Sequence, residues 1–283
     1  MADFKKNKAH PQSEHIARKR FGQNFLHDQN IIDKIIRAIN PKTEQTIIEI
    51  GPGQGALTYP LLKILGQLQA VEIDRDLIDM LNRQSPAFGQ LTIHEGDALK
   101  FDFSQLYSNT GSQQDTAKPE KLRLVGNLPY NISTPIIFHL LEFIDSIYDM
   151  HFMLQKEVVE RMAAKDHNKN YGRLSVMLQW YCEVEYLFDI PASAFNPPPK
   201  VVSSLVRLHP RSKPLASLKD EQQFARLVNK VFQQRRKTIR NTLKNYLSAE
   251  EIQALDISPT ARPETLSILD FARLSNAIST EII

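Results

Sequence analysis

The sequence has a single cysteine, Cys182, so no disulfide can form within this chain of 283 residues, which suits a reducing cytosol. Its eight histidines show no paired metal-ligand spacing, and we therefore expect no structural zinc. No apolar run approaches the roughly 18 residues that a membrane span needs. The charged N-terminus lacks the apolar core of a signal peptide. These absences predict a cytoplasmic globular protein without a membrane partner.

Acidic residues are missing from one long basic segment. Between Gln222 and Ala249 there is no Asp or Glu, although the net charge of the whole chain is only +3. A second basic cluster opens the chain. Charge concentrated in this way predicts an anionic partner. The basic residues of the segment are Arg226, Lys230, Arg235, Arg236, Lys237, Arg240 and Lys244, and those of the opening cluster are Lys5, Lys6, Lys8, Arg18, Lys19 and Arg20.

Strand and helix patterns alternate through most of the chain. This alternation predicts an α/β fold with a mostly parallel sheet and helices on both faces. Only a proline-rich loop joins the last two strands, so we expect them to pair antiparallel. Strands are predicted at 46–50, 68–73, 91–94, 122–126, 148–154, 184–190 and 203–208, and helices at 28–39, with Asp28 as N-cap, 55–65, 133–144 and 156–165.

Polar segments suggest how the chain divides into parts. We expect a basic N-terminal tail at 1–20 and an α/β domain at 21–208 that carries a flexible surface insertion at 108–120. A linker is predicted at 209–214. Every periodic pattern beyond it is helical, so residues 215–283 are predicted to form a small all-α domain, in which "SAEE" (248–251) begins a helix with a capping box.

Four successive predicted strands end in residues that suit a ligand. "EIGPGQGALT" joins the first strand to a helix through glycines, which allow a tight turn and close approach of a ligand. Glu72 ends the second strand, where an acid typically binds a ribose, and Asp97 follows the third. "NLPY" (127–130) ends the fourth. All four ends lie at one edge of a parallel sheet, which predicts a nucleotide pocket there; a plain tight turn and a helix-capping Asp97 are the alternatives.

Several motifs together resemble the ribosomal RNA adenine dimethyltransferase family. They are "QNFL" (23–26), "EIGPGQGALT", "VEID" (71–74), "GDAL" (96–99), "GNLPYNIS", "QKEVVERM" (155–162), "YGRLSVM" (171–177), "FNPPPKV" (195–201) and "RRKTIRNTL" (235–243). The nearest type is the bacterial small-subunit enzyme associated with kasugamycin sensitivity. The insertion at 108–120 is longer than expected of that family. The resemblance implies a Rossmann-like class I methyltransferase sheet and S-adenosylmethionine as methyl donor.

The resemblance also implies which residues hold the donor. Asn24 and Leu26 would close over it, although Asn24 has a second interpretation as a residue that orders the neighbouring loop. Gly51 and Gly53 would let it approach the backbone. The ribose would be held by Glu72, the adenine end by Asp97, and the reactive methyl would sit at Asn127.

"NLPY" suits the activation of a weak nucleophile. The lone pair of an adenine amino group is delocalised into the ring. Acceptance of both amine hydrogens, by the Asn127 side-chain oxygen and the Leu128 carbonyl, would aim that lone pair at a methyl group. Pro129 restricts Leu128 to extended conformations. Tyr130 would stack on the target base and Phe195 on its other face, unless these two rings are ordinary core aromatics.

The basic segment and the resemblance together predict an RNA substrate. The candidate RNA contacts are Lys200, Arg235, Arg236, Lys237 and Lys244, with a structural role between domains as the alternative for Arg235 and Arg236. We expect N6-dimethylation of two adjacent adenosines near the 3′ end of small-subunit (16S) rRNA, in an immature particle during 30S ribosome biogenesis, by a monomer. The competing hypotheses are a large-subunit enzyme of the macrolide-resistance type and an RNA-binding assembly factor.

Overall fold

The computed structural model describes residues 24–108, 121–279 and 282. The predicted basic tail at 1–20 and almost all of the predicted insertion at 108–120 lie outside the described residues. Within the described part of the chain, no helix is long and apolar enough to cross a membrane. The same residues contain no group of three or more His, Cys, Asp or Glu side chains that could hold a metal ion.

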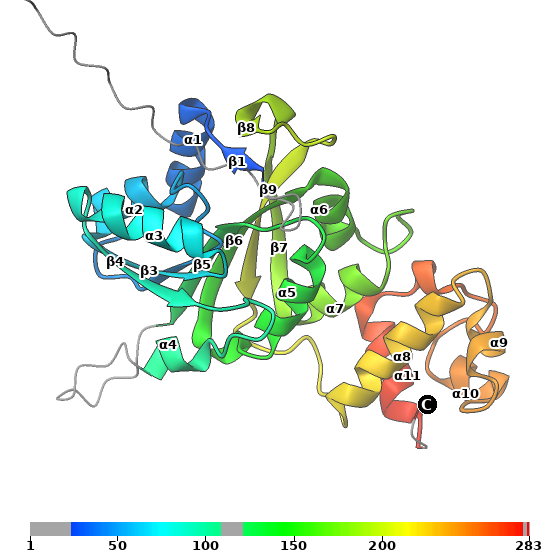
Figure 1. The fold of residues 1–283 in the computed structure, drawn as a ribbon. Coiled ribbons are helices and arrows are strands. Elements are labelled where there is room, and N and C mark those ends of the chain that lie inside the picture. The colour runs from blue at the N-terminus through cyan, green and yellow to red at the C-terminus, as the bar shows by residue number, and fades with distance from the viewer. Residues whose placement is uncertain (1–23, 109–120, 280–281, 283) are drawn as a thin grey trace, which may run out of the picture.

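A seven-stranded sheet forms the centre of the molecule (Figure 1). Its order is β4-β3-β2-β5-β6-β9-β7, and only β9 runs against the other strands. The predicted antiparallel pairing of the last two strands is therefore confirmed. Each predicted strand boundary agrees with the structure to within two residues. The strands are β2 (Ile47–Ile50), β3 (Gln67–Glu72), β4 (Gln90–Glu95), β5 (Leu122–Asn127), β6 (Ile147–Gln155), β7 (Cys182–Ile190) and β9 (Ser203–Pro210), and a separate antiparallel pair is formed by β1 (Phe25–Leu26) and β8 (Phe195–Asn196).

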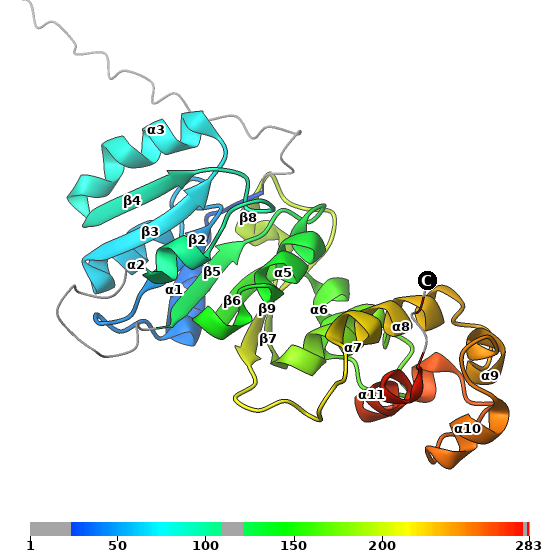
Figure 2. The same ribbon diagram turned by 90° about the horizontal axis from the view of Figure 1, so that it is seen from below.

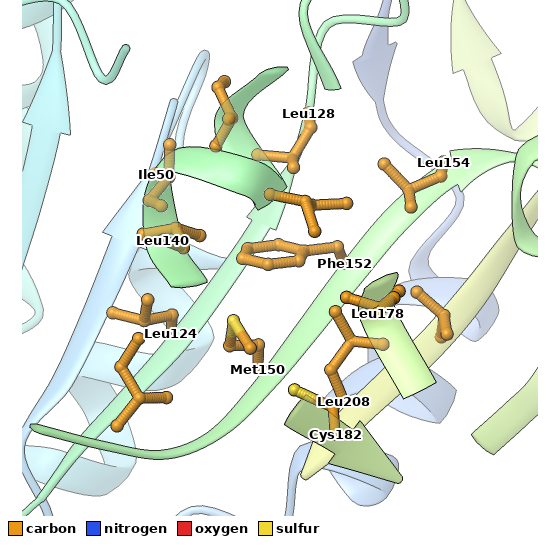
Figure 3. Close-up of a cluster of buried hydrophobic side chains, with 14 of the residues drawn as sticks. Ile50, Leu124, Leu128, Leu140, Met150, Phe152, Leu154, Leu178, Cys182 and Leu208 are labelled. Carbon is orange, nitrogen blue, oxygen red and sulfur yellow. The ribbon is translucent and has the colours of Figure 1, made fainter. Parts of the chain in front are cut away.

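Helices cover both faces of the sheet, as the sequence predicts. One face packs on α1 and α2 and the other on α4 to α7, in two separate hydrophobic clusters. Figure 3 shows part of the second cluster, where Phe152 and Met150 of β6 lie among Leu124, Leu128 and Leu140. The helices of this part are α1 (Gln29–Ile39), α2 (Thr58–Leu65), α3 (Arg75–Gln84), α4 (Ser104–Ser108), α5 (Ser133–Leu141), α6 (Lys156–Ala163) and α7 (Arg173–Tyr181), with 3₁₀ turns at Ser85–Ala87, Ile144–Ser146 and Ala192–Ala194.

Helix α1 begins and ends where its sequence dictates. The Asp28 carboxylate accepts hydrogen bonds from the backbone amides of Asn30 and Ile31, which confirms the predicted N-cap. At the other end, Arg123 of β5 donates to the Ile39 carbonyl at 2.7 Å. Arg123 also forms a buried ion pair with Asp149 of β6 at 2.8 Å, so α1 is fastened to two central strands. Helix α2 starts at Thr58, three residues later than predicted, with its proline in the first turn.

The C-terminal part is helical, and Figures 1 and 2 show it at one end of the molecule beyond α7. Its core includes Trp180 of α7, whose ring lies 4.8 Å from that of Phe224 between centroids. Ser248 and Glu251 form the predicted capping box. The predicted linker is shorter than expected because β9 continues to Pro210. The helices are α8 (Glu221–Gln233), α9 (Ile239–Leu243), α10 (Ala249–Ala254) and α11 (Ile268–Ala277), with a 3₁₀ turn at Pro263–Thr265.

Candidate active site

A cavity of about 280 Å³ opens at the carboxyl ends of the parallel strands. Its wall is formed by residues that lie far apart in the sequence but come from adjacent strand ends. Leu26 is the exception among the predicted donor-binding residues, since it lines a smaller neighbouring cavity beside the glycine turn. The predicted residues that line the main cavity are Asn24, Gly51, Gly53, Glu72, Asp97, Asn127, Leu128, Pro129 and Tyr130.

The glycine turn brings backbone to the cavity surface. Gly51 and Gly53 have φ angles of 67° and 55°, a region that other residues rarely adopt. A Cβ atom on Gly53 would lie 3.2 Å from the ring of Phe25, which covers the turn. The turn is therefore compact as well as left-handed, and the absence of side chains at these glycines lets a ligand approach the backbone.

Glu72 is held in one orientation at the end of β3. Its Oε1 accepts hydrogen bonds from the backbone amides of Ile73 and Asp74 at 2.8 and 2.9 Å. Burial raises the pKa of Glu72, and the amides of Asp74, Ile73 and Gly53 act in the opposite direction. A fixed, buried carboxylate of this kind suits a vicinal pair of ribose hydroxyls.

Asp97 lies on the cavity wall and also stabilises the turn that follows it. Its Oδ1 accepts from the backbone amide of Leu99 at 3.0 Å, and its carbonyl accepts from the amide of Lys100. The alternative interpretation, in which Asp97 caps the following turn, thus describes its local contact, and the residue also lines the cavity. Its role at the adenine end of the donor stays a prediction.

Asn127 ends β5 with its amide oriented by a contact across 103 residues of chain. Its Nδ2 donates to the backbone carbonyl of Asn24 at 2.9 Å. Because only the amide nitrogen can donate to that carbonyl, the contact leaves Oδ1 as the acceptor on the other side of the group. This is the orientation that acceptance of an amine hydrogen requires.

The residues around Asn127 restrict the backbone. A Cβ on Gly126 would lie 2.4 Å from the Ile50 carbonyl oxygen of β2, so only glycine fits this position. Leu128 is 1 % exposed, its side chain belongs to the hydrophobic cluster of Figure 3, and its amide donates to the Met153 carbonyl. Packing therefore holds the backbone in place on both sides of Asn127, at Gly126 and at Leu128.

The two predicted stacking rings occupy different environments. Tyr130 is half-buried on the cavity wall, and its hydroxyl lies 2.6 Å from the Ser203 hydroxyl. Phe195 is 2 % exposed and packs in the cluster of α1 and α2, where it is opposite Leu26 in the β1–β8 pair. Phe195 does not line the main cavity, so stacking on a base would require its ring to leave this packing. In this conformation Tyr130 alone is placed as a platform.

The predicted RNA contacts separate into two groups. Lys200, Arg236, Lys237 and Lys244 are exposed. Arg235 instead donates a hydrogen bond of 2.8 Å to the carbonyl of Lys169, which lies before α7. Its guanidinium group also lies 3.7 Å from the Glu264 carboxylate. These contacts join the end of α8 to the loop before α7. They are the contacts expected if Arg235 has a structural role rather than a role in RNA binding.

Glu49 is a residue for which the sequence suggests no role beyond its position before the glycine turn. It is 2 % exposed and accepts a hydrogen bond from the Thr58 hydroxyl at 2.6 Å. Burial, with a smaller contribution from Glu72, raises the pKa of Glu49 to about 7. It lines the small cavity that also contacts Leu26 and Asn127. A cation bound there would lower this pKa and favour the carboxylate.

Comparisons with known proteins agree with this geometry. The family model described as "Ribosomal RNA adenine dimethylase" matches residues 14–280. A protein of Pseudomonas syringae named "Ribosomal RNA small subunit methyltransferase A" is 53 % identical over 272 residues, which are 96 % of this chain and 98 % of that protein. The protein of the same name from Pseudomonas aeruginosa is 52 % identical over 266 residues, 94 % of this chain and 96 % of that one.

Solved structures agree as well. A dimethyladenosine transferase from Plasmodium falciparum superposes with a TM-score of 0.73 at 28 % identity, over 88 % of this chain and 95 % of that one. The 23S rRNA methyltransferase ErmE shares the fold, with a TM-score of 0.69 at 23 % identity, over 91 % of this chain and 100 % of that one. With a cavity at the strand ends and similarity along nearly its whole length, the chain belongs to the ribosomal RNA adenine dimethylase family of S-adenosylmethionine-dependent methyltransferases.

Proposed function

We propose that the protein methylates the N6 amino groups of two adjacent adenosines near the 3′ end of small-subunit (16S) rRNA. The single observation that carries this proposal is the orientation of Asn127 in the donor cavity. Its Nδ2 is engaged by the Asn24 carbonyl, so its Oδ1 is the atom presented to an incoming amine. The names of the relatives support the small subunit as the source of the substrate.

The residues of the cavity fit S-adenosylmethionine. Glu72 would hold the ribose hydroxyls through its carboxylate, and Asp97 would accept from the adenine amino group. Gly51 and Gly53 would contact the remainder of the donor through their backbone. When bound, S-adenosylmethionine supplies an electrophilic sulfonium methyl group, so the protein has to position the acceptor rather than create a strong base.

The acceptor amine is held by two oxygen atoms. The Asn127 Oδ1 and the Leu128 carbonyl oxygen would each accept one amine hydrogen, which localises the nitrogen lone pair. Leu128 keeps its carbonyl in place because its side chain is buried and Pro129 restricts its backbone. The target base would stack on Tyr130 after it leaves the RNA stack, a step that costs a few kcal/mol. The nitrogen becomes cationic on methylation and loses a proton more readily.

The rest of the chain would bind the RNA. We assign residues 21–208 to methyl transfer and the all-α part from residue 215 to RNA binding, with Arg235 joining the two parts. Lys200, Arg236, Lys237 and Lys244 are exposed cations that would contact phosphates. We propose that the enzyme acts as a cytoplasmic monomer on an immature small-subunit particle during 30S assembly.

The test is to incubate the protein with labelled methyl donor and immature small subunits, and to map the modified nucleotides. We expect label on N6 of two adjacent adenosines near the 3′ end. Asn127→Ala should lower turnover at least about 100-fold, the scale of a lost transition-state hydrogen bond, while it remains folded. Asn30→Ala, at an exposed position on α1, is the matched control. Near-normal turnover by Asn127→Ala, or label elsewhere in the RNA, would refute the proposal.

A further inference from the structure

The hydroxyl of Tyr130 has a partner that the methylation mechanism does not use. It lies 2.6 Å from the hydroxyl of Ser203, across 73 residues of chain. Tyr130 is half-buried and lines the donor cavity, whereas Ser203 is completely buried. A contact of this length is a strong hydroxyl–hydroxyl hydrogen bond.

Ser203 is held rigidly by the sheet. It is the first residue of β9, the only antiparallel strand of the seven, and it pairs with Gln155 of β6 on one side and with Ile190 of β7 on the other. Its hydroxyl is therefore a fixed point between two strands. Just before it, the chain passes through the proline-rich segment 197–200, which includes the exposed Lys200.

The next residue provides an internal contrast. Ser204 is also completely buried, but its hydroxyl donates to Asp189 at 2.7 Å and lies 3.0 Å from the hydroxyl of Tyr186. Successive side chains of a strand point to opposite faces. Two adjacent serines of β9 thus serve different tyrosines, and only the first of these tyrosines lines the donor cavity.

We propose that Ser203 is a positioning residue for the methyl acceptor, which acts by fixing where the Tyr130 ring lies in the cavity wall. The Tyr130 hydroxyl lies on the axis about which its ring rotates, so a bond to it restrains the position of the ring's far end, which shifts when χ1 changes, and not the rotation of the ring about that axis. A hydrogen bond from that hydroxyl to a rigid strand therefore restricts the swing of the whole ring about χ1. The base that stacks on the ring is then placed at one position relative to the Asn127 oxygen. The entropy of ordering the ring is lost during folding rather than during substrate binding.

This inference rests on the proposed function and concerns the acceptor alone. Ser203 is absent from the wall of the donor cavity, so its loss should leave donor affinity unchanged. Particle binding depends on many phosphate contacts and should also change little. Misorientation of the base should therefore lower kcat while KM for the particle stays within about twofold.

The experiment compares four variants with the wild-type protein on immature small subunits. They are Ser203→Ala, Tyr130→Phe, the double variant and Ser204→Ala as the matched control. We expect kcat to fall about 5- to 10-fold in each of the first two, the scale of one lost hydrogen bond. The double variant should fall no further, because both substitutions remove the same bond. Donor affinity, measured by calorimetry, should stay within about twofold in all of them.

Two results would overturn the inference. One is turnover by Ser203→Ala equal to that of Ser204→Ala, and the other is a double variant whose losses multiply. If Ser203→Ala fails to fold, Tyr130→Phe still tests the bond from its more accessible end, and full turnover by that variant is the refuting result. Failure of the proposed function itself would be recognised separately, as absence of methyl transfer to small subunits by the wild-type protein.

Discussion

Replacement of Gly126 by alanine tests whether the spacing between β2 and β5 sets the geometry of the active site. The added Cβ would lie 2.4 Å from the carbonyl oxygen of Ile50, which belongs to backbone rather than to a flexible side chain. A tolerable contact begins near 3.4 Å, so the two strands would have to separate by roughly 1 Å at this point. Gly51 follows Ile50 directly after the end of β2, and Asn127 follows Gly126 in β5. The shift would therefore displace the glycine turn from Asn127, that is, the proposed donor site from the proposed acceptor site.

The size of the effect follows from this displacement. Overpacking of a well-packed interior typically costs about 1–3 kcal/mol. At roughly 2–4 °C per kcal/mol for a chain somewhat smaller than this one, a cost of about 2 kcal/mol lowers Tm by about 4–8 °C. A misplacement of about 1 Å in an active site can cost about 100-fold in rate. Gly126→Ala should therefore be moderately destabilised and nearly inactive at a temperature where it is still folded.

Gly172→Ala is the matched control. Gly172 is the N-cap of α7, and a Cβ added there has nothing within 4 Å. This substitution should cost less than about 1 kcal/mol, the range of an N-cap exchange, and should leave turnover unchanged. Thermal unfolding, donor calorimetry and labelled methyl transfer at 25 °C measure the three quantities. If Gly126→Ala bound donor and methylated RNA as well as Gly172→Ala, the argument from strand spacing would be wrong.

Two further predictions concern charge. Reversal of both Lys237 and Lys244 to Glu should weaken binding to rRNA and reduce the salt slope of that binding by about 0.7 per lost contact, with donor affinity unchanged; an unaltered slope would remove these lysines from the interface. Burial lowers the pKa of His151 to about 4 in the folded protein, whereas the same imidazole in the unfolded chain takes up a proton near pH 6.5. Unfolding free energy should therefore fall by up to roughly 3 kcal/mol between pH 6.5 and 4 relative to His151→Gln, and parallel pH curves for the two proteins would contradict this.

The convergence of the residues proposed to bind the donor was predictable because they follow strands directly. Glu72 and Asp97 end or follow strands that a short apolar run identifies, and parallel strands bring their ends to one edge. Asn127, Leu128 and Pro129 follow one another in the sequence, so the proposed acceptor oxygens and the proline that restricts the Leu128 backbone can be recognised together. The predicted roles of these residues in donor and acceptor binding stay predictions, while their convergence in one cavity is now visible.

What the sequence did not reveal depends on contacts between distant segments. The bond of Asn127 to the Asn24 carbonyl spans 103 residues, and that of Tyr130 to Ser203 spans 73. No local pattern encodes such pairs, since a serine at the start of a strand has many possible neighbours. Gly126 shows the same limit, because its need for glycine comes from a carbonyl on another strand.

The helical part shows why a composition shift is a poor guide to a structural boundary. The shift falls after residue 208, but the core that α8 and α11 complete already includes Met177 and Trp180 of α7 and Tyr171 just before it. Arg235 adds a hydrogen bond from the end of α8 to the Lys169 carbonyl. The exposed lysines beyond α8 thus belong to a helical part that shares its core with α7 of the α/β part. Because such packing is stiff, it would hold these lysines at a set distance from the cavity at the strand ends. Under the proposed function, an RNA would then be selected by whether its backbone and its extruded adenine match that distance.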